Sequence, residues 1–232
     1  MIQRYDVVVI GGGLAGLTAA LFSARYGLKT VVLERLMSGG QVVNSELIED
    51  FPGFSDGIGG FDLGPKVQTQ AEAAGVEFKM SEASAIHLAS PYRVVMTGDG
   101  QYQARAIIVA GGSTLRTLGL AREGALHGSG VSYCASCDGP FFVDQTTGVV
   151  GGGDAALEEA LTLSKYASHV IIFHRRSNFR AQKILQEQVS ANSKIEICWN
   201  TEVTELIGES QLEAVTTRGT RNGEIKRVDL SG

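Results

Sequence analysis

The chain has 232 residues, a formal net charge of −5 and 44% apolar residues, among them 30 glycines. This length holds one large domain or two ordinary ones. The net negative charge gives no indication of nucleic-acid binding, and no apolar run approaches the length of a membrane span. The N-terminus lacks the pattern of a signal peptide, and three cysteines are few for a secreted fold held by disulfides. We therefore expect a cytoplasmic α/β protein that binds neither nucleic acid nor membrane.

A repeat in the chain predicts two nucleotide-binding units. Residues 8–35 align without a gap with residues 148–175, so that Gly11 falls on Gly151. Each copy reads as an apolar strand, a glycine turn, an amphipathic helix and a second apolar strand, which is a βαβ unit. One glycine fingerprint is weak evidence for a dinucleotide site, but two copies between a strand and a helix are strong evidence. The predicted fold class is therefore α/β with two Rossmann-like units.

The segment between the two copies is expected to add strands to the first unit. After a glycine-rich loop at 38–61, the pattern predicts a helix near residues 62–75 and strands at 76–80, 85–88, 92–97 and 104–110. Asp99-Gly100 marks a hairpin turn before the last strand. Residues 111–118 read as a hinge, which gives domains at 1–113 and 114–232.

The ends of the second strands in the two copies predict different ligands. The first copy ends on Glu34, and a carboxylate there accepts hydrogen bonds from ribose hydroxyls, as FAD or NAD requires. The second copy has His174 at that place, followed by Arg175, Arg176 and Arg180. Arginines attract a 2′-phosphate and grip it bidentately, which favours NADPH. The alternative is that these arginines form a solvated face, as most charge runs do.

The glycines of each turn have separate mechanical roles. Gly11 and its counterpart Gly151 permit the tight turn, and Gly13 and Gly153 let the backbone approach a pyrophosphate at the helix N-terminus. Gly16 lets the helix pack closely on the strand, and Ala156 is an allowed variant in the second copy. In the loop that follows the first copy, Gly39, Gly40 and Gln41 bring backbone and one amide against a flavin edge.

The pair Cys134 and Cys137 lies fourteen residues before the second glycine turn, followed by Asp138. Two cysteines with two residues between them close a small disulfide and favour a lowered thiol pKa. The alternatives are half of a zinc site or an inert buried pair, but zinc normally requires four ligands at paired spacings. Neither Cys198 nor the histidines His87, His127, His169 and His174 make a matching pair. Cys198 itself reads as a buried strand residue.

These motifs together resemble the low-molecular-weight thioredoxin reductases, a class of flavoproteins. The motifs that carry the resemblance run from residue 8 to 181: the first glycine turn with Glu34, Gly39-Gly40-Gln41, Phe51-Pro52-Gly53-Phe54, Cys134-Ala-Ser-Cys137-Asp138-Gly139, Gly151-Gly-Gly-Asp154-Ala-Ala156, and His174-Arg175-Arg176 with Phe179-Arg180-Ala181. The resemblance implies FAD on the first unit, NADPH on the second, a homodimer, and a swinging NADPH domain that carries the thiol pair.

The resemblance also implies the site residues and their roles. Electrons pass from NADPH through FAD to the Cys134–Cys137 disulfide and then to thioredoxin or a similar protein disulfide. Cys137 faces the flavin, Cys134 attacks the partner, and Asp138 is the candidate acid or base. The alternative interpretation of Asp138 is that it is only a turn residue before Gly139-Pro140. The implied cofactor-binding residues are Gly11, Gly13, Ala15, Gly16, Glu34, Gly39, Gly40, Gln41, Gly151, Gly153, Asp154, Ala155, Ala156, His174, Arg175, Arg176 and Arg180.

The chain departs from the family pattern at three points. Leu14 stands where the family usually has proline, and Asp50 where it usually has an asparagine near the flavin. The sequence stops at Gly232, about where the family's chain returns to complete the FAD domain, so we expect weak FAD binding. Two other functions stay open: a reductase that serves a peroxiredoxin-type partner, which the absence of an N-terminal thioredoxin-like module disfavours, and a nucleotide-binding fragment without activity.

Overall fold

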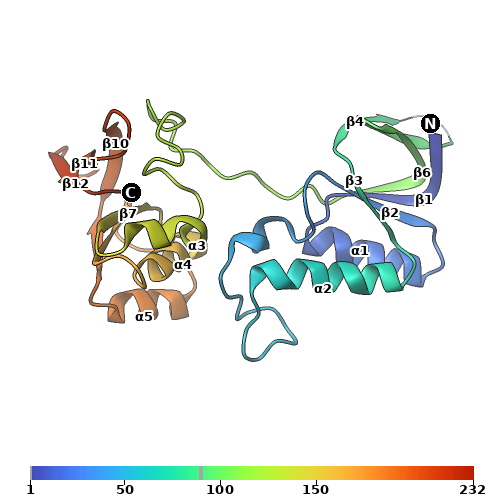
Figure 1. Ribbon diagram of the computed structural model, residues 1–232, viewed down its shortest axis with the longest axis horizontal. Helices are drawn as coiled ribbons and strands as arrows, with labels where there is room; N and C mark the ends of the chain where they lie inside the picture. Colours follow the sequence, from blue (N-terminus) through green and yellow to red (C-terminus); the bar gives the residue numbers. More distant parts are fainter. Residues whose placement is uncertain (1, 89–90) are drawn as a thin grey trace. The chain divides into compact units, whose positions relative to one another are not determined.

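The computed structural model describes residues 2–88 and 91–232. It divides into two compact units, Met1–Thr114 and Leu115–Gly232. Each unit holds one copy of the repeat, and Figure 1 shows the strands and helices of each. None of the helices in the described part of the chain has the length and apolarity that a membrane span needs.

The first unit is built on a six-stranded sheet. Its strands are β1 (Ile2–Ile10), β2 (Thr30–Glu34), β3 (Glu77–Met80), β4 (Ala83–Leu88), β5 (Arg93–Thr97) and β6 (Gly100–Val109), in the order β3-β2-β1-β6-β5-β4. The first four in that order are parallel, whereas β5 and β4 join as an antiparallel meander. This confirms the Rossmann-like unit with an added strand-rich segment. The strand expected from residue 104 begins earlier, because Thr97 pairs directly with Gly100 across the hairpin.

Two helices cover one face of this sheet, as Figure 1 shows. They are α1 (Leu14–Arg25) and α2 (Gly60–Ala73), and a short 3₁₀ helix, η1 (Gly40–Asn44), lies in the glycine-rich loop before α2. Alternate side chains in the β-branched run of β1 point to opposite faces of the sheet. Val9 packs in the apolar cluster between the sheet and the helices, and Val8 packs in the cluster on the other face. Helix α1 ends before Gly27, whose φ of +81° suits a left-handed C-terminal turn.

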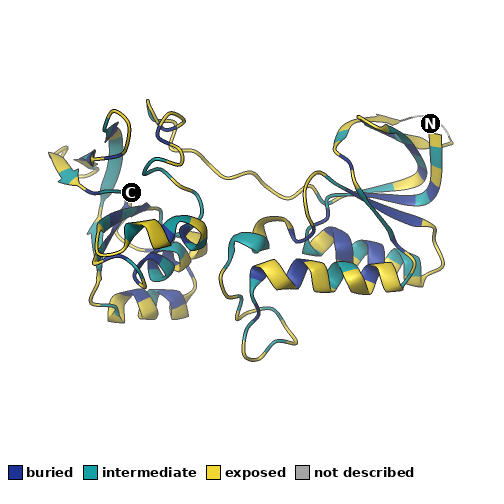
Figure 2. Cartoon of the chain, viewed as in Figure 1, coloured by how far each residue is buried: buried dark blue, intermediate teal, exposed yellow. Residues whose placement is uncertain are grey.

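The second unit combines two three-stranded sheets. The parallel sheet holds β7 (Thr146–Val150), β8 (His169–His174) and β9 (Ile195–Trp199), and the antiparallel sheet holds β10 (Thr201–Ile207), β11 (Ala214–Gly219) and β12 (Ile225–Asp229). Its helices are α3 (Ala135–Asp138), η2 (Gly139–Phe142), α4 (Asp154–Leu163) and α5 (Lys183–Ala191). One core cluster joins α4 and α5 to the parallel sheet, and another joins the two sheets. Figure 2 shows buried residues along the strands and on one side of the helices.

Cys198 lies in a strand, as predicted, but it is only half-buried. The prediction of full burial was wrong because β9 is the outer strand of its sheet, which leaves one side of the strand uncovered. Burial, followed by the neighbouring Glu196 carboxylate, raises the pKa of the Cys198 thiol. The thiolate form is therefore disfavoured at this cysteine.

Candidate functional site

The first glycine turn joins β1 to α1. Gly11 has a φ of +105°, and a Cβ on it would clash with the Ala110 carbonyl. A Cβ on Gly16 would clash with the Gly11 carbonyl, so helix and strand approach each other as closely as the fingerprint requires. Gly13 differs, because a Cβ there would come no nearer than 3.8 Å to another atom. The protein's own packing therefore leaves the face of Gly13 open at the N-terminus of α1, whose first two residues are Leu14 and Ala15.

The Glu34 carboxylate lies against this turn. Its Oε2 accepts the Gly12 N–H at 2.6 Å, and its Oε1 accepts the Leu36 N–H at 3.1 Å. A carboxylate accepts more than two hydrogen bonds, so it retains capacity for ribose hydroxyls. The end of β2 and the glycine turn thus lie in direct contact.

The segment Gly39–Gln41 lies against the same turn. The Gly39 N–H donates to the Gly12 carbonyl at 2.9 Å, and Gly39 forms an isolated bridge with Gly13. Both Gly39 and Gly40 have positive φ values, 114° and 64°. The Gln41 side-chain amide donates to the Ser113 carbonyl at 3.2 Å. The structure therefore gathers the residues predicted for the first unit around one turn.

The second glycine turn joins β7 to α4. Gly151 has a φ of +158°, and a Cβ on it would lie 2.6 Å from the Ala156 Cβ, so Ala156 fills the place that Gly16 holds in the first unit. A Cβ on Gly153 would meet nothing within 4 Å, which leaves the N-terminus of α4 open, with Ala155 exposed in its first turn. The Asp154 carboxylate accepts the Gln182 N–H at 2.6 Å and so ties the start of α4 to the segment before α5.

His174 and the arginines separate at the end of β8. The His174 ring is buried, packs against Gly152 so closely that a Cβ there would clash with it, and bonds to the Asn178 carbonyl at 3.0 Å. Arg175 and Arg176 follow at once and are exposed. Arg180 is exposed as well, and its N–H donates to the Gly152 carbonyl at 2.8 Å. The histidine thus supports the turn, while three guanidinium groups remain free to meet an anion.

The two cysteines of the predicted redox pair form a disulfide, with their Cα atoms 5.3 Å apart. Cys134 precedes α3 as its N-cap, and its sulfur accepts the Cys137 N–H at 3.2 Å. Cys134 is half-buried and Cys137 is exposed. The half-buried Asp138 ends α3, and its N–H donates to the Cys134 carbonyl at 3.1 Å. The pair is therefore neither unbonded nor fully buried, which argues against an inert pair of core thiols.

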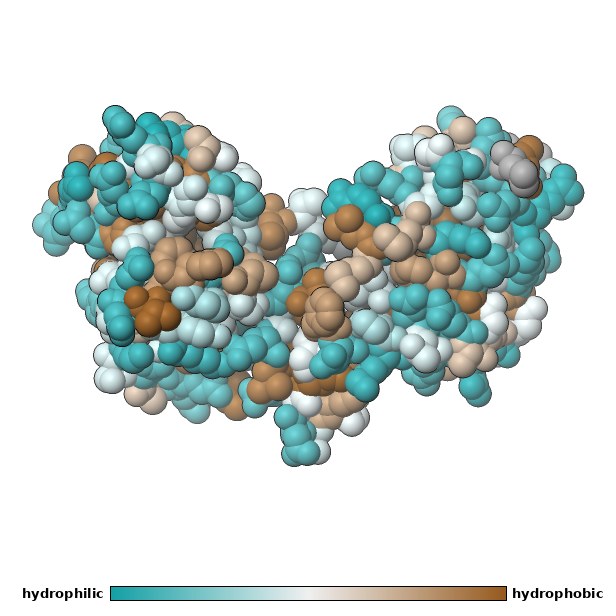
Figure 3. All heavy atoms as spheres, viewed as in Figure 1, coloured by the Kyte–Doolittle hydropathy of each residue, from teal (hydrophilic) through white to brown (hydrophobic). Residues whose placement is uncertain are grey.

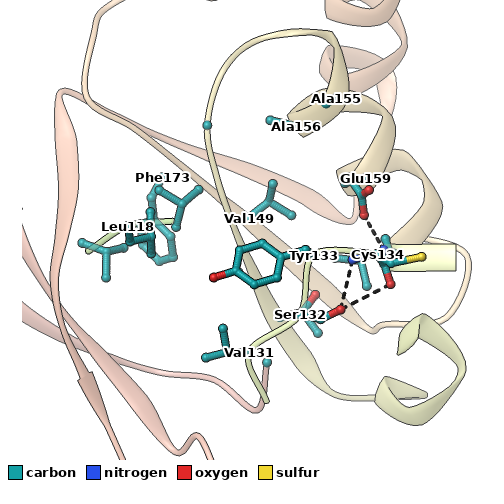
Figure 4. A pocket seen from close by; sticks show the side chains of 18 of the residues that line it. Leu118, Val131, Ser132, Tyr133, Cys134, Val149, Ala155, Ala156, Glu159 and Phe173 are labelled. Atoms are coloured by element: carbon teal, nitrogen blue, oxygen red, sulfur yellow. Dashed lines mark hydrogen bonds between the residues drawn. The ribbon is translucent and has the colours of Figure 1, made fainter. Parts of the chain in front are cut away.

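A pocket of ≈ 650 Å³ connects the disulfide with the second glycine turn. Its lining includes Cys134 and Asp138 from the redox segment and Gly151–Ala156 and Arg180 from the nucleotide turn. Figure 4 shows Tyr133 and Cys134 on one side of the pocket, with Ala155, Ala156 and Glu159 of α4 above them. Within the second unit, the structure thus brings Cys134, Asp138 and most of the predicted NADPH-binding residues to one cavity. Cys137, His174, Arg175 and Arg176 do not line it.

Two carboxylates at this site were not predicted from the sequence. Glu159 of α4 accepts the Ala135 N–H, between the two cysteines in the chain. Glu123 is buried and accepts the Leu118 and Gly119 N–H groups, both at 2.8 Å, and the Tyr133 hydroxyl at 2.6 Å. Each stands next to another charged residue in the sequence, Glu158 or Arg122, and this pattern does not indicate a buried partner.

The pKa values of these two carboxyl groups are shifted in opposite directions. Burial raises the pKa of Glu159, and the hydrogen bond from Ala135 opposes this shift. Burial also acts to raise the pKa of Glu123, but the hydrogen bonds from Tyr133 and the three N–H groups of residues 118–120 outweigh it and lower the pKa. Charge-assisted hydrogen bonds of this kind stabilise the ionised carboxylate.

Residues 5–230 match the model of the family described as pyridine nucleotide-disulphide oxidoreductase. A thioredoxin reductase of Mycolicibacterium smegmatis is 43% identical over 228 residues, which cover 98% of this chain and 73% of the relative. A thioredoxin reductase of Bacillus subtilis is 42% identical, with 98% and 72% covered. Among solved structures, a thioredoxin reductase of Lactococcus lactis (FR conformation) matches with a TM-score of 0.95 at 38% identity, covering 98% of this chain and 75% of that one.

Proposed function

Because the chain belongs to the pyridine nucleotide-disulphide oxidoreductase family, we propose that it takes part in the reduction of thioredoxin, or of a similar protein disulfide, by NADPH through FAD. The observation that carries this proposal is the Cys134–Cys137 disulfide, whose Cys134 lines the same pocket as the second glycine turn. The names of the relatives support thioredoxin as the partner. The two units correspond to an FAD-binding domain and an NADPH-binding domain.

The first unit has the features that FAD requires. Gly13 is open at the N-terminus of α1, where backbone N–H groups and the helix dipole bind a pyrophosphate. Glu34 would hold the ribose hydroxyls, and Gly39, Gly40 and Gln41 lie on the same turn to meet the flavin. When bound, the flavin supplies a two-electron carrier between the nicotinamide and the disulfide.

The second unit has the features that NADPH requires. Gly153 leaves the N-terminus of α4 open for the pyrophosphate. The exposed Arg175, Arg176 and Arg180 would hold the 2′-phosphate, since no carboxylate stands at the end of β8 to repel it. His174 has an indirect role, because its buried ring packs against Gly152 and keeps the turn in place.

The thiol pair performs the exchange with the protein partner. In the reduced state, the Cys134 thiolate attacks one sulfur of the partner disulfide and the partner's other sulfur leaves as a thiolate. The Cys137 thiolate then attacks the Cys134 sulfur, which releases the partner's second thiolate and re-forms the Cys134–Cys137 disulfide. Two electrons pass to the partner, and each released thiolate takes up a proton. Asp138, one residue from Cys137 and in the same pocket, is the acid or base that moves this proton.

The function is tested with the purified chain supplied with FAD, NADPH and an oxidised thioredoxin. We expect NADPH oxidation that depends on FAD and thioredoxin, and alkylated-peptide mapping that shows Cys134 and Cys137 protected before NADPH and labelled after it. Cys198, with its raised pKa, serves as an internal control that labels slowly in both states. Equal labelling of Cys134 and Cys137 in both states, or zinc that co-purifies and protects them, would contradict the proposal.

Asp138→Asn tests the proton step. We expect thiol–flavin exchange to slow by ~10²-fold, the lower range for loss of a positioned acid or base. Asp144→Asn is the matched control, because Asp144 is exposed on a nearby turn and has a φ of +60°, which asparagine adopts readily. An equal effect of both substitutions would assign Asp138 to the turn rather than to the chemistry.

A further inference from the structure

Glu159 links the nucleotide turn to the redox helix. It lies on α4 (Asp154–Leu163), the helix that begins at the second glycine turn, and its half-buried carboxylate accepts the N–H of Ala135. Figure 4 shows this interaction beside Cys134. Ala135 follows Cys134 directly and is itself buried, so this N–H has no access to bulk water. A buried N–H without an acceptor is costly, and Glu159 removes that cost.

Two other donors of the redox helix reach the Cys134 sulfur. The Cys137 N–H reaches it at 3.2 Å and the Ser136 hydroxyl at 3.4 Å. In the disulfide the Cys134 sulfur carries no hydrogen, so the Ser136 hydroxyl donates. After reduction the same donors stabilise a thiolate at Cys134. Glu159 opposes them, because its carboxylate is bonded to the N–H of Ala135, the residue that follows Cys134, and so places a negative charge near that thiolate.

The charge of Glu159 has a definite effect on the redox equilibrium. Reduction of the pair takes up two electrons and one proton and leaves one thiol and one thiolate. A carboxylate next to the new thiolate disfavours the reduced state, and partial burial strengthens the interaction because the local dielectric is lower than that of water. When the reduced form of a thiol pair is destabilised, the reduction potential of the pair falls. The reduced pair then gives its electrons away more readily.

We propose that Glu159 is a positioning residue with two roles: it holds the Cys134–Cys137 helix through the Ala135 N–H, and its negative charge lowers the reduction potential of the pair. This inference rests on the proposed function, in which the pair passes electrons to a protein disulfide. It gives α4 a part in both halves of the site, with the open Gly153 at its start and Glu159 at its second turn.

The test is a redox titration of the whole chain in buffers of reduced and oxidised dithiothreitol at constant pH. The Cys134–Cys137 peptide is quantified by acid quench, alkylation and mass spectrometry, which separates it from Cys198. We expect Glu159→Gln to raise the ratio of reduced to oxidised pair about tenfold, a potential ~30 mV higher for two electrons. We also expect Cys134 of the reduced variant to alkylate faster at that pH, because its thiolate fraction rises.

Two further variants separate charge from position. Glu158→Gln removes the same charge from an exposed neighbour on α4 and is expected to change the ratio by less than twofold. Glu159→Ala removes the acceptor as well, so the Ala135 amide should also lose its protection from hydrogen exchange. If that variant does not fold, the near-isosteric Glu159→Gln still decides the charge effect.

The outcomes distinguish this inference from the function on which it rests. A ratio for Glu159→Gln within twofold of the unsubstituted chain overturns the inference, and so does an equal shift in Glu158→Gln. If the unsubstituted chain forms no Cys134–Cys137 disulfide at any buffer ratio, the proposed function fails instead.

Discussion

Both glycine turns join a strand to a helix, but different side chains pack against their middle glycines. In the first unit the Gly12 N–H donates to the Glu34 carboxylate at 2.6 Å. In the second unit Gly152 lies against the buried His174 ring, and the charged groups that follow are exposed arginines. One turn therefore has a carboxylate beside it, whereas the other is followed by exposed cations. In the proposed function, the residue that ends the second strand directs the same βαβ geometry to a different dinucleotide in each unit.

The units also differ in what accompanies the turn. In the first unit the glycine-rich segment Gly39–Gln41 lies against the turn, and in the second unit Cys134 of the disulfide lines the pocket beside the turn. Hydrophobic and hydrophilic side chains are interspersed over the visible face of each unit, as Figure 3 shows. The two units thus differ in a few residues at their turns, and substitutions at those residues test the difference.

The largest effect is expected from removal of the thiol pair, which the second unit alone carries. Cys134→Ser leaves no partner for Cys137, so we expect complete loss of the disulfide and of protein-disulfide reduction. Cys198→Ser is the matched control, since Cys198 lies on β9 away from the pocket that holds the pair, and it should retain full activity. The measurement is thioredoxin-dependent NADPH oxidation, with labelled-thiol counts by mass spectrometry. Residual thioredoxin reduction in Cys134→Ser would show that another thiol performs the exchange.

The next effect concerns the cations of the second turn. Arg175→Ala with Arg176→Ala should narrow the preference for NADPH over NADH by ~2–4 kcal/mol, because hydrogen bonds to charged groups contribute ~1.5–3 kcal/mol each. The fold should tolerate the change, since both side chains are exposed and the hydrogen bonds of this segment to Asn200 and Thr220 use its carbonyl groups. Titration calorimetry with each nucleotide gives the two affinities. Equal affinities in the unsubstituted chain would refute the assignment of NADPH to this unit.

Local patterns predicted the parts of the molecule that depend on neighbours in the chain. Glycine turns, apolar strands and the Cys-x-x-Cys motif each have a fixed spacing, and the structure places them as two Rossmann-like units with a disulfide at Cys134–Cys137. The hairpin predicted at Asp99-Gly100 is confirmed by the antiparallel pairing of β5 with β6, although β6 begins earlier than its pattern indicated.

Contacts between distant elements could not be predicted in this way. Glu159 meets Ala135 across 24 residues and Glu123 meets Tyr133 across 10, and neither spacing belongs to a helix or strand period. The half-burial of Cys198 depends on which strand ends the sheet, and the burial of His174 depends on the absence of a side chain at Gly152. Such features require the packing of whole elements rather than the pattern within one.

A smaller effect distinguishes the middle glycine from the one after it. Gly152→Ala would drive a Cβ into the buried His174 ring and should destabilise the second unit by ~1–3 kcal/mol, the usual cost of overpacking. Gly153→Ala is the matched control, because its Cβ meets nothing within 4 Å; it should leave stability unchanged and weaken NADPH binding. Urea unfolding and nucleotide titration measure the two effects. Equal destabilisation by both substitutions would show that the turn tolerates no side chain for reasons other than the histidine.

The smallest effect compares the carboxylates that hold backbone N–H groups in the two units. Glu34 accepts two N–H groups at the first glycine turn, whereas the buried Glu123 accepts N–H groups of residues 118–120 and the Tyr133 hydroxyl. Glu123→Gln keeps one acceptor oxygen and loses the charge, so we expect a loss of about 1 kcal/mol in unfolding free energy at neutral pH.

The pH dependence of that loss identifies the cause. The hydrogen bonds hold the pKa of Glu123 in the folded protein below its ordinary value of 4.5, so its contribution is fully present above that pH. It disappears as the pH falls through the lower pKa of the folded state. Urea midpoints measured from pH 7 to pH 3.5 should therefore show the midpoint of the unsubstituted chain approaching that of Glu123→Gln in acid. The midpoint of Tyr133→Phe should lie between the other two at neutral pH. Parallel curves for the three proteins would mean that the Glu123 charge does not stabilise the loop, and that its two oxygens act only as neutral acceptors.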